Sequence, residues 1–114
     1  IFCKFDMEWT LEAVRNILEN ALKYSPEGSE IRIEIVPNEA FTCIRIQDEG
    51  IGIREEEQGL VFERFYRSPD VKKEQGMGIG LYLAREIITR QGGYIEVRSE
   101  YAKGTCFCIY LPNF

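Results

Sequence analysis

Three polar side chains with metal- and phosphate-binding chemistry recur within the stretch "NILENALKY". Asn16, Asn20 and Lys23 are separated by four and three residues, and in an α-helix this spacing places them in one narrow arc. An amide oxygen is a suitable ligand for Mg²⁺, and an ammonium group suits phosphate. A purely solvated helix face is the alternative, although Glu, Lys or Gln would serve it at lower cost than asparagine.

A second group with binding chemistry follows a predicted strand, in "DEGIG". Asp48 ends the strand, and Gly50 and Gly52 follow at alternate positions. Two such glycines let the backbone turn sharply and approach a flat ligand closely, while the carboxylate can accept a hydrogen bond from an exocyclic amine. The same residues are also typical of an ordinary acidic turn.

A third group is the run "GMGIGL", in which Gly76, Gly78 and Gly80 lead into a predicted helix. Glycines at a helix entrance leave backbone N–H groups free to hold phosphate, and the helix dipole assists them. The G-x-G-x-G spacing matches neither the dinucleotide-binding fingerprint nor the Walker A loop. The run alone therefore leaves phosphate binding open.

Aromatic and basic side chains occupy the segment between the two glycine clusters. Phe62, Phe65 and Tyr66 would anchor a lid, meet a partner, or form a satellite core under a long loop. The cations of the same segment either reach phosphate or are only solvated. They are Arg64, Arg67, Lys72 and Lys73.

Two helices must position these groups. Apolar residues at helical spacing predict a helix over 8–24, which "SPEGS" ends, and a second over 79–91, which Gly92-Gly93 ends. In the first helix we expect the asparagines to lie opposite the centre of an apolar stripe. That stripe consists of Leu11, Val14, Leu18 and Ala21.

Alternating apolar and polar residues predict the strands of a sheet. The predicted strands are 1–5, 30–36, 41–48, 94–100 and 105–111. Residues 49–80 form an irregular stretch, of a length that is usually functional or mobile, with a short helix expected within 55–65. The order predicts one α/β domain over 1–114, in which about two or three helices cover one face of about five strands.

Composition excludes several classes of function. The chain has no histidine, which removes imidazole as a base, nucleophile or metal ligand. A net charge of −5 argues against nucleic-acid or anionic-membrane binding. No apolar run approaches the about 20 residues of a membrane span. Four cysteines without a C-x-x-C pair predict no zinc site, and we expect reduced thiols in a soluble, cytosolic domain.

Taken together and in order, four motifs resemble the N, G1, F and G2 boxes of the ATP-binding catalytic domain of bacterial sensor histidine kinases. The boxes are residues 16–24, 48–53, 61–67 and 76–81, with an ATP lid over about 53–77. These kinases belong to the GHKL group with DNA gyrase and mismatch-repair ATPases. The resemblance implies the group's two-layer α/β sandwich (the Bergerat fold), a mixed sheet of about five strands with about three helices on one face.

The resemblance also implies roles for single residues, with ATP and Mg²⁺ as cofactors. Asn20 would hold Mg²⁺ with help from Asn16, Lys23 would contact phosphate, Tyr24 would pack on the adenine and Asp48 would accept its amine. Arg67 would reach the γ-phosphate and, with Asn16 and Lys23, serve transfer. The other nucleotide-binding positions would be Gly50, Gly52, Ile53, Gly76, Gly78, Gly80, Leu81 and Thr105.

Asn16 separates two branches of the group. Gyrase-like ATPases carry a water-activating glutamate four residues before the metal asparagine, and an amide cannot take that proton. The F box also belongs to the kinases. The resemblance therefore implies transfer of a phosphoryl group rather than hydrolysis.

The expected acceptor is a histidine on a separate dimerisation domain, because this chain has none. We expect the domain to serve a response regulator indirectly, in the cytoplasmic part of a membrane-anchored sensor, without touching nucleic acid or membrane. A serine kinase of the anti-sigma-factor type and a nucleotide-binding interaction module without transfer activity remain the alternatives.

Overall fold

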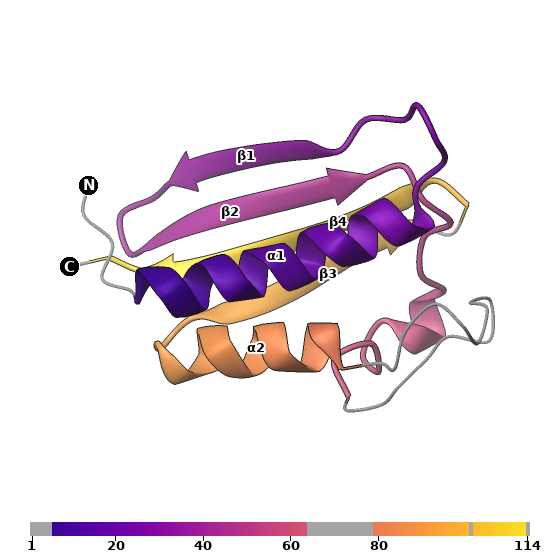
Figure 1. Ribbon diagram of the computed structural model, residues 1–114. Helices are drawn as coiled ribbons and strands as arrows, with labels where there is room; N and C mark the ends of the chain where they lie inside the picture. The colour runs from indigo at the N-terminus through magenta and orange to yellow at the C-terminus, as the bar shows by residue number, and fades with distance from the viewer. Residues whose placement is uncertain (1–5, 64–78, 101, 114) are drawn as a thin grey trace.

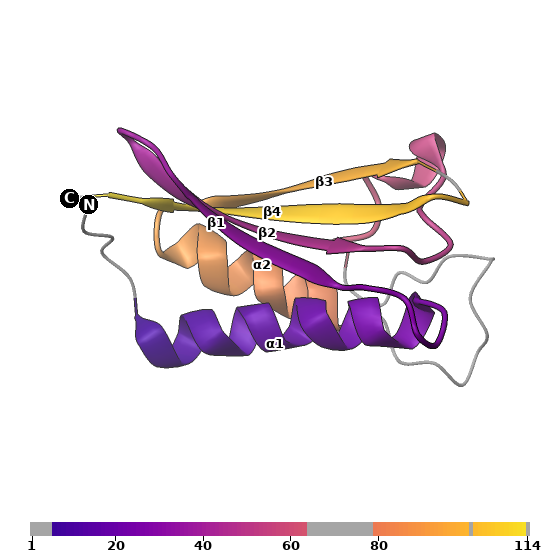
Figure 2. The same cartoon turned by 90° about the horizontal axis from the view of Figure 1, so that it is seen from above.

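Two helices lie against one face of a four-stranded sheet in the computed structural model of the chain (Figure 1). The model describes residues 6–63, 79–100 and 102–113. Its elements are α1 (Met7–Tyr24), β1 (Arg32–Pro37), β2 (Phe41–Asp48), η1 (Glu55–Glu57), α2 (Gly80–Arg90), β3 (Tyr94–Glu100) and β4 (Gly104–Pro112). Figure 2 shows the two layers edge-on, with both helices on the same side of the sheet. This α/β arrangement confirms the predicted class.

Both predicted helices are confirmed, and their ends have local causes. Asp6 begins α1, where its carboxylate accepts a hydrogen bond from the Trp9 backbone N–H at 3.1 Å. At the end of α2, Gly92 takes a φ of 84° and the Gly93 N–H bonds to the Ile88 carbonyl at 3.0 Å. A glycine in this left-handed conformation ends a helix at no steric cost.

The sheet has the order β1-β2-β4-β3, and all three pairings are antiparallel. The mixed sheet expected from the resemblance is therefore wrong for the described strands. The chain passes from β2 through α2 to β3, and these two strands do run in the same direction. However, β4 lies between them and pairs with both, so no parallel pair forms.

Two further expectations differ from the structure. The strand expected at 1–5 lies outside the described residues, which contain four strands rather than about five. The short helix expected within 55–65 is a single 3₁₀ turn, η1, followed by turns up to residue 62. After this turn, Val61 and Phe62 are adjacent in sequence and both are buried in the core, whereas residues 64 and 65 lie outside the described part of the chain.

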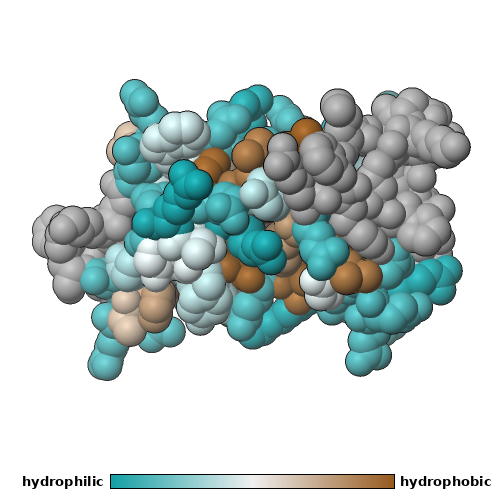
Figure 3. Space-filling view, turned by 90° about the horizontal axis from the view of Figure 1, so that it is seen from below, coloured by the Kyte–Doolittle hydropathy of each residue, from teal (hydrophilic) through white to brown (hydrophobic). Residues whose placement is uncertain are grey.

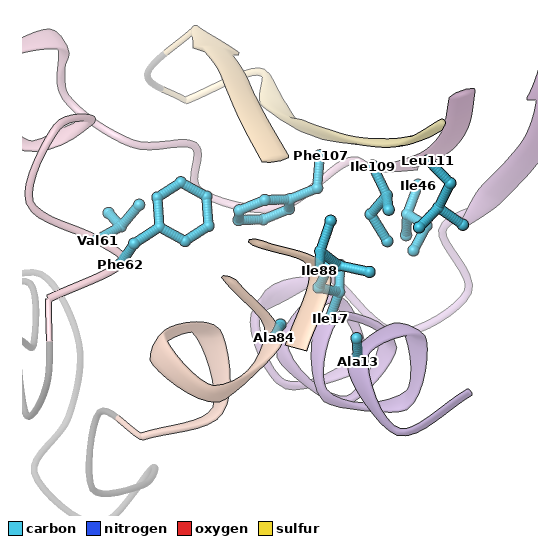
Figure 4. Close-up of a cluster of buried hydrophobic side chains, with 10 residues drawn as sticks. All are labelled: Ala13, Ile17, Ile46, Val61, Phe62, Ala84, Ile88, Phe107, Ile109 and Leu111. Atoms are coloured by element: carbon cyan, nitrogen blue, oxygen red, sulfur yellow. The ribbon is translucent and has the colours of Figure 1, made fainter. Parts of the chain in front are cut away.

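The core joins the helices to the sheet and reaches the segment before the undescribed residues (Figure 4). Phe62 meets Phe107 edge to face, with ring centroids 6.0 Å apart and planes at 78°. Phe62 therefore packs in the main core rather than in a satellite core, a lid or a partner contact. The buried core residues are Ala13, Ile17, Ile46, Val61, Phe62, Ala84, Ile88, Phe107, Ile109 and Leu111.

The apolar stripe of α1 is rotated from its predicted position. Its buried residues are Thr10, Ala13, Ile17 and Ala21. Leu11 and Leu22 are exposed. The small side chains of Ala13 and Ala21 let α1 approach the rest of the core closely, so the side of the helix that carries them is the buried one. The expectation that the asparagines oppose the stripe is wrong, because they lie at its flank.

The thiols and the surface agree with the composition. Cys43, Cys106 and Cys108 are free, and Cys43 and Cys108 are buried, which confirms the expectation of reduced thiols for these three.

No helix of the described part is long and apolar enough to cross a membrane. In the view from below, hydrophilic residues predominate among those drawn in colour, with small apolar patches between them (Figure 3).

Candidate functional site

Of the elements that begin or end at one end of the molecule, five carry residues of the candidate site (Figure 1). These residues lie at the C-terminal ends of α1, β2 and β3 and the N-terminal ends of β4 and α2, and Figure 2 shows the same end of the molecule from above. The arrangement gathers residues that the sequence motifs had singled out in separate segments. Tyr24, Asp48, Gly80 and Thr105 all lie at these element ends.

Three polar residues form a row across the sheet at this end. Thr105 on β4 pairs with Asp48 on β2 and with Ser99 on β3. Strand alternation places this row on the same face as the core residues Ile46 and Phe107, which is the face that the helices cover. Asp48 and Thr105 are each only 6% exposed, so these are buried polar groups in need of partners.

Backbone N–H groups hold the Asp48 carboxylate. Asp48 Oδ1 accepts a hydrogen bond from Gly50 N at 2.8 Å, and the backbone N–H of Thr105 also bonds to this carboxylate. Burial nevertheless raises the pKa of Asp48 above its ordinary value of 3.8, although these two hydrogen bonds oppose the rise. No lysine or arginine of the described residues forms an ion pair with it. The site thus presents an acceptor that a neutral donor can satisfy.

Glycine is required at two close approaches around this carboxylate. A Cβ on Gly104 would lie 2.2 Å from the Asp48 carbonyl oxygen, and Gly104 has a φ of 129°. A Cβ on Gly50 would lie 2.7 Å from the Tyr24 carbonyl oxygen, so the segment after β2 packs directly on the end of α1. Gly52 adds a left-handed turn with a φ of 77°.

The asparagine helix face borders the same region. Asn16 and Asn20 are half-buried, whereas Lys23 is exposed and makes no ion pair with any described residue. A Cβ on Gly80 would meet the Cβ and Oδ1 of Asn16, each at 3.9 Å. The start of α2 therefore lies against the first asparagine.

Two buried side-chain atoms lack a hydrogen-bond partner within the described ranges, Asn16 Nδ2 and Ser25 Oγ. A buried polar group without a partner is costly and calls for an explanation such as a missing ligand or water. A half-turn of the Asn16 amide exchanges its nitrogen with its oxygen, so the same position offers a donor or an acceptor. Its oxygen is the hard donor type that Mg²⁺ takes.

Sequence reasoning missed two residues of the site. Ser99 Oγ accepts from Ile53 N at 2.7 Å and lies 2.9 Å from Thr105 Oγ1. Gln58 Nε2 donates to the carbonyl oxygens of both Ile53 and Ser99, each at 3.0 Å. Ser99 could have been identified by pairing the two predicted strands 94–100 and 105–111 as a hairpin, because this places Ser99 opposite Thr105. No pattern in the sequence marks Gln58.

The remaining predicted residues divide into two groups. Ile53 and Leu81 are half-buried and pack against the core, so each is anchored at the border of the site. Arg67, Gly76 and Gly78, with most of the expected lid, lie outside the described residues. The described residues contain no group of three or more His, Cys, Asp or Glu that would hold a metal by itself. A cation here would therefore need amide oxygens together with ligand oxygens.

Comparisons with known proteins identify the family of the chain. Residues 6–113 match the family described as "Histidine kinase-, DNA gyrase B-, and HSP90-like ATPase". The chain is similar to the sensor protein SrrB of Staphylococcus aureus strain NCTC 8325 / PS 47, at 38% identity over 119 residues, which cover 98% of this chain and 20% of SrrB. It thus spans about a fifth of the length of the curated relatives that it matches.

Solved structures give the same result. The chain is similar to the mycobacterial sensor histidine kinase MprB, with a TM-score of 0.86 at 34% identity, covering 95% of this chain and 74% of that one. The catalytic domain of the histidine kinase ThkA gives a TM-score of 0.82 at 24% identity, covering 96% of this chain and 70% of that one. At that identity the second likeness concerns the fold alone.

Proposed function

The chain belongs to the histidine kinase-, DNA gyrase B- and HSP90-like ATPase family as the catalytic ATPase domain of a two-component sensor histidine kinase, and from this premise we propose how its residues act. It binds ATP with Mg²⁺ and donates the γ-phosphoryl group to a histidine carried by another domain. The buried carboxylate of Asp48, held by two backbone N–H groups and paired with no described cation, is the observation that carries the proposal.

The base end of the nucleotide lies at the sheet. Asp48 accepts a hydrogen bond from the exocyclic amine of adenine, which supplies the neutral donor that a buried carboxylate requires. Gly50 and Gly52 keep the backbone close to the base, and Tyr24 and Ile53 border it. Thr105 adds a hydroxyl on the neighbouring strand, directly opposite Asp48.

The phosphate end lies over the asparagine face of α1. Asn20 and Asn16 are the residues that would hold Mg²⁺, and the ion would neutralise charge on the phosphates. Lys23 reaches phosphate with an ammonium group that is exposed and makes no ion pair among the described residues. The α2 entrance, at Gly80 and Leu81, points backbone N–H groups toward the same region. Arg67, Gly76 and Gly78 keep the roles that the family resemblance gives them.

Transfer rather than hydrolysis follows from the chemistry of α1. Activation of water needs a group that takes a proton, and the amide of Asn16 cannot. The nearest carboxylates on this helix, Glu12 and Glu19, both pair with Arg15 on the exposed face. Arg15 thus engages both carboxylates. Phosphoryl transfer depends mainly on positioning and charge neutralisation, so the nucleophile can come from another domain.

The proposal extends to the setting of the domain. Its acceptor partner is the histidine-bearing dimerisation domain of the same kinase, and a response regulator receives the phosphoryl group in turn. The domain works in the cytoplasm, as part of a membrane-anchored sensor, without itself contacting the membrane or nucleic acid.

Two measurements test the proposal. Calorimetry with ATP and Mg²⁺ should show binding to the folded chain, and the absence of heat would overturn it. Incubation with γ-labelled ATP and the purified histidine-bearing domain should then label that domain with an acid-labile, base-stable phosphate. An acid-stable label would instead indicate a serine kinase, and ATP binding without any label would indicate an interaction module.

A further inference from the structure

Ser99 lies where the base end of the site meets the segment after β2. Its hydroxyl is half-buried and touches three groups: the backbone N–H of Ile53 at 2.7 Å, the carbonyl oxygen of Gly104 at 2.8 Å and the hydroxyl of Thr105 at 2.9 Å. A serine hydroxyl has one proton to donate and two lone pairs to accept with. These three contacts therefore use its full capacity.

Counting protons fixes the direction of each bond. The Ile53 N–H can only donate, and the Gly104 carbonyl can only accept, so Ser99 accepts from the first and gives its single proton to the second. The bond to Thr105 must then run from Thr105 to Ser99. Thr105 has no other hydroxyl proton, and its oxygen keeps lone pairs alone for any further partner.

Gln58 holds Ser99 in this geometry. Its side-chain nitrogen donates to the carbonyl oxygens of Ile53 and Ser99, each at 3.0 Å. Ile53 is thus tied to Ser99 directly through its N–H, and indirectly through its carbonyl by way of the Gln58 amide. Side chains that are fixed from several directions lose little entropy when a ligand binds, and such pre-organisation favours selectivity.

We propose that Ser99 is a specificity-determining positioning residue of the nucleotide site: by taking the proton of Thr105, it leaves only acceptors at the base edge, on Asp48 and Thr105. The inference rests on the proposed binding of ATP at Asp48. A base that presents an amino group satisfies both acceptors. A base that presents a carbonyl oxygen at the same position meets oxygen with oxygen and is rejected.

Inosine triphosphate is the suitable probe, because its base carries a carbonyl where adenine carries the amine. The dissociation constants of ATP and inosine triphosphate, each with Mg²⁺, are measured by calorimetry on the wild-type chain and on Ser99→Ala. Without Ser99, the Thr105 hydroxyl can turn and donate to the carbonyl. The ratio of the two constants, inosine triphosphate over ATP, should fall about three- to tenfold.

A matched variant separates chemistry from packing. Ser99→Thr keeps the hydroxyl and should hold the ratio within about twofold of wild type, whereas a loss of stability alone raises both constants together and leaves the ratio unchanged. Gln47→Leu is the control for a change next to the site, because this exposed side chain lies on the opposite face of β2. An unchanged ratio in Ser99→Ala overturns the inference.

A second variant decides the question if Ser99→Ala does not fold. Thr105→Val replaces the hydroxyl by a methyl group of the same shape, so it removes the acceptor and should also lower the ratio. A ratio that stays equal or rises overturns the inference, because it would mean that Thr105 does not present an acceptor to the base. Wild-type chain that binds no ATP overturns the proposed function as well, whereas ATP binding with unchanged ratios overturns only the role of Ser99.

Discussion

Asn16 and Gly80 face one another across the two helices: the nearest described atoms that a Cβ on Gly80 would meet are Cβ and Oδ1 of Asn16, at 3.9 Å. That distance is an ordinary van der Waals contact, and Gly80 does not have a positive φ. The fold of α2 therefore does not require glycine at its first residue.

Gly80→Ala should accordingly raise stability and weaken nucleotide binding. Restricting the unfolded chain stabilises the fold by about 0.4–1 kcal/mol, as urea unfolding would measure. The added methyl group lies over the amide that we propose faces the phosphates, so the ATP affinity should fall about threefold or more. Gly59→Ala is the control, because a Cβ there meets nothing within 4 Å. Loss of stability in Gly80→Ala would show that the start of α2 needs glycine after all.

Asp48→Asn should separate binding from folding. The asparagine oxygen can still accept from the Gly50 N–H, and relief of the buried charge offsets a weakened bond to the Thr105 N–H, so the unfolding free energy should change little. ATP affinity should fall about ten- to hundredfold, because a charged acceptor for the amine is lost. The exposed neighbour Glu49→Gln, measured in parallel, should bind like wild type. Equal affinities for all three proteins would contradict the role of Asp48.

Acidification should weaken ATP binding because it protonates Asp48. This loss should occur at a pH above 3.8, which is the ordinary pKa of an aspartate side chain. Burial raises the pKa of this carboxyl in the folded chain, so the folded state binds the proton more tightly than the unfolded state does. Acidification through the raised pKa therefore relieves a cost to stability, but it removes the acceptor for the base. Below that pKa the affinity should fall about tenfold per pH unit. Protonation of the triphosphate affects the wild-type chain and Asp48→Asn equally. If the fall in affinity with acid is absent from the pH profile of Asp48→Asn, it is assigned to protonation of Asp48.

Gly104→Ala should disrupt the site and the fold together. The new Cβ would lie 2.2 Å from the Asp48 carbonyl oxygen, and a φ of 129° strains any side chain. We expect a loss of about 3 kcal/mol in the unfolding free energy and of ATP binding. Differential scanning fluorimetry and calorimetry measure both effects. Gly59→Ala again serves as the control, and a wild-type melting temperature for Gly104→Ala would contradict the close approach.

The helices and the residues on them could be predicted because their signals are local. Repeats at helical spacing around Ile17 and Ile88 give both helices within one residue of their ends, and Asp48 stands visibly at the end of an alternating run. The direction of the apolar stripe could not be predicted, because Leu11 and Ala13 differ in burial only through what packs against them.

The sheet order and the Ser99 network depended on non-local pairing. The alternation in β4 predicts a strand, but it does not predict that this strand lies between β2 and β3. Because β4 separates these two strands, the described sheet is antiparallel and not mixed as expected. Ser99 meets Ile53 across 46 residues of sequence, and Gln58 meets Ser99 across 41. Neither contact leaves a pattern that a single sequence can reveal.

The central place of β4 has a consequence for how the protein matures. The last described strand of the chain lies between two earlier strands, and it supplies Thr105 and Gly104 to the site. A growing chain on the ribosome can form α1 and the β1-β2 hairpin early, since these are local structures. The base site that we propose at Asp48 is incomplete until β4 has left the ribosome and inserted. We therefore expect nucleotide binding only of the finished domain, because a chain interrupted before residue 104 has Asp48 on the β1-β2 hairpin but lacks β4, which completes the proposed site around it.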